Sequence, residues 1–105
     1  MENQEKIQHL QILEQNLQRI LMQKNSYQMD LAETESALNE VKKSEGDVHR
    51  IIGQLMIKVS KEKVISELED KKKKVDSKVK ALEKQEKEFV EQSNSLREEI
   101  FSKKE

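Results

Sequence analysis

Apolar residues recur at steps of three and four along most of this chain, and this spacing predicts two long helices separated by a short β segment. The first series is apolar except at Lys24 and Thr34 and extends over more than four heptads, which is typical of a coiled-coil seam. Its positions are Leu10, Leu13, Leu17, Ile20, Lys24, Tyr27, Leu31, Thr34, Leu38 and Val41.

A second series of similar length follows the β segment. Its positions are Ile65, Leu68, Lys72, Val75, Val79, Leu82, Glu86, Phe89, Ser93, Leu96 and Ile100, of which eight are apolar. Two seams of similar length around a compact turn favour a chain that folds back into an antiparallel two-helix coiled coil. A parallel dimer of each arm is the alternative. The polar seam positions Lys24, Lys72 and Glu86 are expected to loosen the arms without breaking them.

The segment 48–59 predicts a β-hairpin. Two runs rich in β-branched and apolar residues, Val48–Ile52 and Leu55–Val59, flank Gly53-Gln54, and glycine first is what a two-residue type II′ turn requires. The expected pairs are Ile52 with Leu55, Ile51 with Met56, Arg50 with Ile57, His49 with Lys58 and Val48 with Val59. A slip of one residue would exchange the two faces.

One face of this hairpin is expected to be apolar and to need a partner. It carries Val48, Arg50, Ile52, Leu55, Ile57 and Val59, and the other face is mixed. An isolated hairpin is marginally stable in water, and its two open edges recruit other strands. We therefore predict that the hairpin is an assembly site, with Gly53 forming its turn.

The chain is expected to form one domain over residues 1–105. A helix is predicted over 1–45, and Gly46 is expected to end it in the left-handed conformation after two lysines. Ser60 is expected to cap a second helix over 61–105.

Composition narrows the function classes. Charged residues make up 39% and apolar residues 33% of the chain, which fits solvated helices with a narrow seam. The sequence shows no signal peptide, membrane span or cysteine, and a cytoplasmic protein is expected. The net charge of −1 argues against nucleic acid as a partner.

No catalytic or cofactor-binding pattern stands out. His9 and His49 have no other metal ligands at suitable spacing, and the two glycines form no phosphate loop. The run Lys71–Lys74 is interpreted as a solvated helix face neutralised by flanking acids, in preference to a phosphate-binding patch. We expect no enzyme activity, no metal and no cofactor.

The two chain ends carry more apolar residues than one seam needs. Ile12, Leu21 and Met22 lie off the seam, and Phe101 lies next to it. The proposed binding tip comprises Ile7, Leu10, Leu13, Leu17, Leu96, Ile100 and Phe101. Exposed apolar patches of this kind commonly bind another protein. Frayed ends with scattered apolar residues are the alternative. Lys103-Lys104 is interpreted as solvated, with docking to an acidic partner as the other possibility.

Two segments carry a resemblance to a known family. The stretches RIIGQLMIKVSKEKVISEL (50–68) and KALEKQEK (80–87) lie between and within the heptad arms. Most specifically in these stretches, the chain resembles the beta subunits of prefoldin in their archaeal form. The resemblance implies a hexamer of two alpha and four beta subunits whose hairpins form β-barrels. It also implies tips that hold non-native polypeptide and pass it to a group II chaperonin without ATP. A structural coiled-coil scaffold or tether without client binding is the alternative function.

Overall fold

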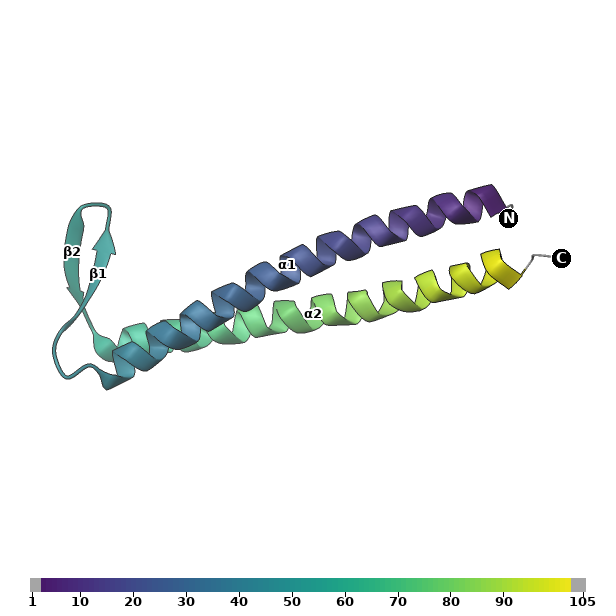
Figure 1. Cartoon of the computed structure of the whole chain (residues 1–105). Coiled ribbons are helices and arrows are strands. Elements are labelled where there is room, and N and C mark those ends of the chain that lie inside the picture. Colours follow the sequence, from purple (N-terminus) through teal and green to yellow (C-terminus); the bar gives the residue numbers. More distant parts are fainter. Residues whose placement is uncertain (1–2, 103–105) are drawn as a thin grey trace. The chain divides into compact units, whose positions relative to one another are not determined.

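The structure is a computed structural model that describes residues 3–102. Two long helices, α1 (Asn3–Lys43) and α2 (Lys61–Ser102), are joined by a hairpin of strands β1 (Val48–Ile52) and β2 (Leu55–Val59) (Figure 1). The helix–hairpin–helix fold predicted from the sequence is confirmed. Neither helix contains proline or glycine, the residues that most often interrupt helices.

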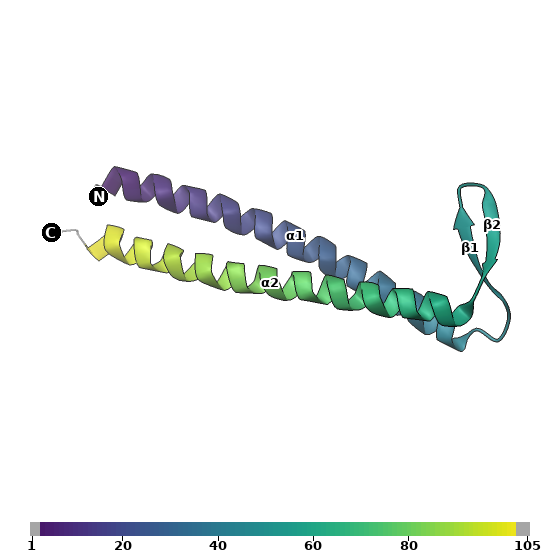
Figure 2. The same ribbon diagram turned by 180° about the vertical axis from the view of Figure 1, so that it is seen from behind.

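The described residues form two compact units. The terminal unit consists of α1 up to Ser26 together with α2 from Val79, and the hairpin unit is Tyr27–Lys78. In each unit a segment of α1 runs antiparallel to a segment of α2, as the two opposite views show (Figures 1 and 2). The fold-back interpretation is therefore correct, and no second chain is needed to pair the helices.

The two predicted seams form the cores of these units. Every apolar position of both series is buried or half-buried. The most deeply buried apolar side chains are Leu13, Ile20, Val79 and Leu96 in the terminal unit and Leu38 and Val75 in the hairpin unit. Lys72 is the exception among the polar seam positions, because it is exposed and reaches Glu35 on α1 at 3.6 Å. Its long stem lets the ammonium leave the seam for water.

Helix α1 ends two residues earlier than predicted, and Gly46 does not end it. The amide of Ser44 donates to the carbonyls of Glu40 and Val41 at 3.1 and 3.2 Å, and the helix ends at Lys43. Gly46 does not have a positive φ, so the left-handed cap expected there is wrong. The carbonyl of Lys42 in the last turn and that of Ser44, just past the helix, accept hydrogen bonds from the Lys61 ammonium of α2.

The hairpin has the predicted register. Val48 pairs with Val59 at its base and Ile52 with Leu55 beside the turn, and the three pairs between them match as well. Gly53 has a φ of 62°, and no other described residue has a positive φ. Since a type I′ turn needs positive φ at both central residues, Gln54 excludes it, and the turn agrees with type II′.

Helix α2 begins as predicted after Ser60. The Ser60 Oγ accepts the amide N–H of Lys63 at 3.3 Å, and its carbonyl accepts that of Val64 at 3.1 Å. This is the N-cap arrangement, in which a side-chain oxygen satisfies a backbone donor of the first turn. Within residues 3–102, neither helix has a stretch apolar enough to cross a bilayer.

Candidate assembly and binding surfaces

The hairpin exposes apolar side chains on both faces. On the predicted face, Ile52, Leu55 and Ile57 are exposed, Leu55 by 65%, while Val48 and Val59 at the base are half-buried. On the opposite face Ile51 is 70% exposed, and Met56 is also exposed. The second face keeps its predicted mixed composition, because His49 and Lys58 lie on it beside these two exposed apolar residues. Exposure of this extent on a two-stranded sheet is typical of a surface that another protein covers.

The predicted tip residues fall into three groups in the terminal unit. Leu13 and Leu96 are buried in the seam, with 3% and 7% exposure. Leu10, Leu17 and Ile100 are half-buried. Only Ile7 and Phe101 are exposed, by 43% and 61%. Lys103-Lys104 lies outside the described residues.

Other apolar side chains of the terminal unit are exposed instead. Ile12, Leu21 and Met22 lie on the surface, as their off-seam positions indicated. Val90 is exposed as well, and sequence reasoning missed it. The signal was present, because Val90 follows the seam residue Phe89 and therefore lies off the seam.

Two polar seam positions pair with each other. The Nζ of Lys24 donates to Oε1 of Glu86 at 2.9 Å, and Glu83 lies 3.9 Å from the same ammonium. The hydrogen bond to Glu86 is the main cause that raises the pKa of Lys24 above 10.5, and burial partly opposes it. The sequence identified Lys24 and Glu86 as polar seam positions but did not pair them, because 62 residues separate them.

Two small polar residues also lie in the seams. Thr34 is buried in the hairpin unit, and its Oγ1 donates to the carbonyl of Asp30 at 2.7 Å, one turn earlier. Ser93 is buried in the terminal unit, and its Oγ has no hydrogen-bond partner among the described residues. Such a hydroxyl contributes less to the seam than an apolar side chain of the same size.

Ion pairs line the flanks of both helix pairs. Arg97 pairs with Glu14 at 2.9 Å in the terminal unit, and Lys71 pairs with Asp30 at 3.1 Å in the hairpin unit. Lys71 and Lys72, from the four-lysine run, thus have acidic partners on α1 rather than only the flanking acids of α2. Exposed pairs of this kind contribute little to stability, about 0–1 kcal/mol each.

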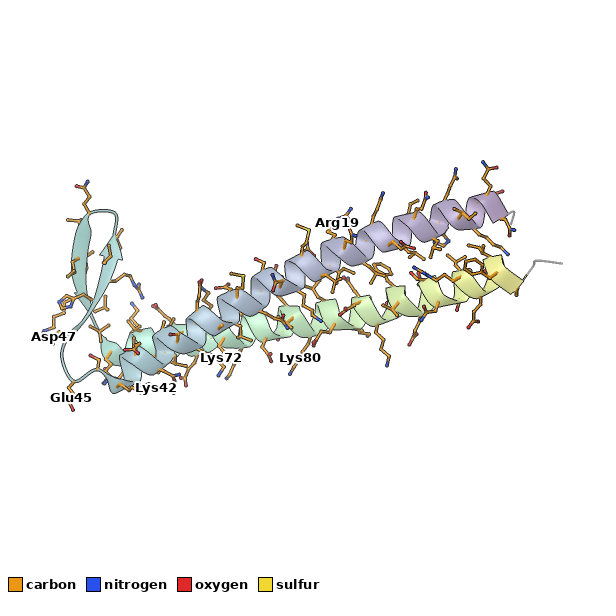
Figure 3. The ribbon with its side chains drawn as sticks, in the orientation of Figure 1. Arg19, Lys42, Glu45, Asp47, Lys72 and Lys80 are labelled. Carbon is orange, nitrogen blue, oxygen red and sulfur yellow. The ribbon has the colours of Figure 1, made fainter. Side chains whose placement is uncertain are left out.

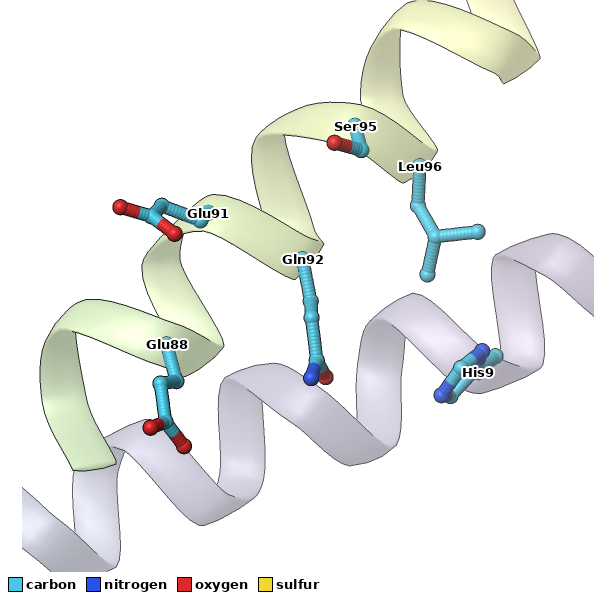
Figure 4. Close-up of a pocket in the computed structure, with 6 residues that line it drawn as sticks. All are labelled: His9, Glu88, Glu91, Gln92, Ser95 and Leu96. Atoms are coloured by element: carbon cyan, nitrogen blue, oxygen red, sulfur yellow. The ribbon is translucent and has the colours of Figure 1, made fainter.

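His9 borders a shallow groove of about 400 Å³ between the helices of the terminal unit (Figure 4). Antiparallel pairing places His9 on the same groove as Glu88, Glu91, Gln92, Ser95 and Leu96 of α2, and Leu96 lies closest to it in the close-up. In the close-up Gln92 and Leu96 point toward α1. Among residues 3–102 no three His, Cys, Asp or Glu side chains are placed to hold a metal ion.

Comparison with known proteins identifies what the fold resembles. A family model described as "Prefoldin subunit" matches residues 4–104. The prefoldin subunit beta of Thermococcus kodakarensis is 34% identical over 95 residues, which cover 89% of this chain and 81% of that protein. The corresponding protein of Archaeoglobus fulgidus is 38% identical over 79 residues, 73% of this chain and 68% of that protein.

A solved structure agrees with these matches. The crystal structure of the prefoldin beta subunit from Thermococcus strain KS-1 has a TM-score of 0.89 and 31% sequence identity to this chain. The similarity covers 95% of this chain and 90% of that one.

Proposed function

This chain belongs to the prefoldin family, and on that basis we propose that its hairpin joins it to other prefoldin subunits while its helix ends hold non-native polypeptide. The chain is a prefoldin chaperone subunit of the beta type. Prefoldin is a family of chaperones rather than of enzymes.

The proposed assembly is a hexamer with two alpha subunits and four copies of this chain, located in the cytoplasm. The observation that supports it best is the exposed hairpin, which offers apolar side chains on both faces and two open strand edges. Burying apolar surface contributes about 25 cal/mol per Å² removed from water. Further strands that pair with the open edges would also satisfy the backbone groups that the hairpin leaves unpaired.

The proposed client site is the exposed apolar surface of the terminal unit. Ile7 and Phe101 lie near the beginning of α1 and the end of α2, which are side by side in both views (Figures 1 and 2). Each such surface is small, so a single one binds weakly. Several on one platform act together through their effective concentration. Weak individual contacts also permit release to a group II chaperonin without ATP.

The assembly step is tested by placing charges on the hairpin. The double variant Ile52→Asp/Leu55→Asp is expected to abolish the complex with an alpha subunit, because two buried carboxylates cannot be solvated in an apolar interface. Met29→Asp is the matched control, since Met29 is an exposed apolar residue of α1. Native mass spectrometry measures the number of copies. A double variant that still forms the full hexamer would overturn the proposed interface.

Client binding is tested separately by suppression of aggregation of a chemically denatured substrate protein. The assembled wild-type complex is expected to keep the substrate in solution without ATP. A complex of correct stoichiometry that gives no protection would favour a structural scaffold instead.

A further inference from the structure

A lysine of one helix caps the end of the other at the base of the hairpin. The last carbonyls of an α-helix have no partner within the helix. The Nζ of Lys61, the first residue of α2, lies 2.6 Å from the carbonyl oxygen of Ser44 and 3.4 Å from that of Lys42. Lys61 is half-buried. Its ammonium thus satisfies the carbonyl end of α1, where the helix dipole favours a positive charge.

Lys61 is a positive charge at the beginning of its own helix, where such a charge is unfavourable. Cations are disfavoured in the first turn of a helix, where the dipole favours acidic residues such as Glu62. Within α2 alone, a lysine as the first residue is therefore a poor choice. Residues that break a local rule commonly serve a purpose elsewhere in the structure. Here the purpose is the contact with α1, which closes the loop that contains the hairpin.

Two ion pairs act on the same part of the chain. Arg50 of β1 pairs with Glu67 of α2, and Lys58 of β2 lies 3.6 Å from Asp47 just before β1. Figure 3 shows Lys42 at the end of α1 and Asp47 at the base of the hairpin. These two pairs are exposed, and such pairs hold their partners weakly. Lys42 of α1 also lies 3.7 Å from Glu69 of α2, and both of these side chains are exposed. The half-buried Lys61, with two carbonyl acceptors, is the less exposed of these two contacts between the helix ends.

We propose that Lys61 is a positioning residue that fixes the direction in which the hairpin leaves the two helices of the hairpin unit, so that the hairpin is oriented for assembly before a partner binds. This inference rests on the proposed function of the hairpin as the assembly site. A hairpin that is already oriented loses less conformational freedom on association, and this favours binding.

The hairpin direction is measurable without any partner. The chain has no cysteine, so Gln54→Cys/Asp70→Cys introduces two spin-label sites, one at the hairpin turn and one on α2, both exposed. Pulsed electron–electron double resonance on label-diluted full-length chain then gives a distribution of distances. We expect a narrow distribution in this background and a clearly broader one when Lys61→Met is added. Methionine keeps the length and apolar stem of lysine but removes the donor.

Two further variants separate positioning from loss of charge. Lys63→Met removes a positive charge from the same turn of α2, from an exposed side chain, and should leave the distribution narrow. Lys61→Arg retains hydrogen-bond donors at this position, so its distance distribution should be as narrow as that of the background. Helix content by circular dichroism is expected to be equal in all variants. In assembly assays with an alpha subunit, Lys61→Met should weaken association roughly tenfold, and Lys63→Met should not.

Three results would overturn the proposal. These are an unchanged distance distribution in Lys61→Met, an equal broadening in Lys63→Met, and a broadened hairpin that assembles as tightly as the wild type. The label distances do not depend on the hairpin being the assembly site, whereas the aspartate variants test that site directly. A failure of either claim is therefore recognised separately.

Discussion

At the scale of single residues, the polar side chains in the seams find partners that depend on how the helices are aligned. The sequence predicted that Lys24 and Glu86 would loosen the coiled coil, but they form a hydrogen-bonded ion pair across it. Sequence spacing shows that each lies on a seam, and it does not show which residue of the other helix lies opposite. A polar pair in an apolar seam favours the one alignment that satisfies both groups.

The first prediction concerns this pair. Lys24→Glu should lower the midpoint of thermal unfolding, because it places a third carboxylate beside Glu83 and Glu86. Exchanging the charges with Lys24→Glu/Glu86→Lys should recover most of the loss, since the opposite charges again face each other. Circular dichroism measures both midpoints. A double variant no more stable than Lys24→Glu would mean that the pair does not couple the helices.

The second prediction concerns the cap of α2. The amide N–H of Glu62 and the hydroxyl of Ser60, at 3.1 Å, hydrogen-bond to the Glu62 carboxylate and hold its pKa below the ordinary value of 4.5. Because the folded state has the lower pKa, this contribution to stability is full above about pH 4.5 and is lost as the pH falls through the lowered value.

Carbon-detected NMR titration of Glu62 checks this prediction. In the wild type its pKa should be below 4.5, and Ser60→Ala should move it upward, because the hydroxyl donor is lost. The same variant also removes the helix cap, which costs about 0.5–2 kcal/mol at any pH. An unchanged Glu62 pKa in Ser60→Ala would show that the hydroxyl does not hold the carboxylate.

At the scale of the elements, the hairpin was predicted pair by pair, while the end of α1 was not. The register follows from one glycine at the first turn position between two runs of five residues, and each of these is visible in the sequence. At the end of α1, the carbonyl of Ser44 accepts a hydrogen bond from Lys61, which is 17 residues away in the sequence. The sequence prediction placed the helix end at Gly46 because glycine commonly ends helices. A contact with a residue distant in the sequence could not be predicted in this way.

The third prediction uses the two glycines as a matched pair. A Cβ added to either meets no atom within 4 Å, so only the backbone conformation differs between them. Gly53→Ala forces an L-residue into positive φ and should destabilise the hairpin by about 1–2 kcal/mol. Gly46→Ala should be neutral or stabilise the protein by about 0.4–1 kcal/mol, because it restricts the unfolded chain.

The hairpin effect is measured through cross-strand NMR contacts between Ile52 and Leu55 and through the affinity for an alpha subunit. Gly53→Ala should weaken both. If the two alanine variants behave alike, the positive φ of Gly53 has no energetic role.

At the scale of the whole molecule, the sequence indicated where apolar residues gather. It did not indicate which of them are exposed and which are buried in the seam. Leu13 and Ile7 are both apolar residues near the beginning of α1, but the seam buries Leu13 and leaves Ile7 exposed. From the sequence alone, an apolar residue near a seam fits either of two roles, packing in the core or binding another protein. Burial separates them, and it assigns Leu13 and Leu96 to the core of the terminal unit.

This division gives the last prediction. Ile7→Ser/Phe101→Ser removes exposed apolar surface and should reduce the suppression of substrate aggregation several-fold, while assembly and the thermal midpoint stay unchanged. Leu13→Ala should instead destabilise the protein by about 2–5 kcal/mol, the usual cost of a cavity in a core. Met29→Ser is the control, because it removes a comparably exposed side chain from the hairpin unit. Light scattering of a denatured substrate gives the activity. If Met29→Ser reduces protection as much as the double variant does, clients bind along α1 in general and not at the helix ends.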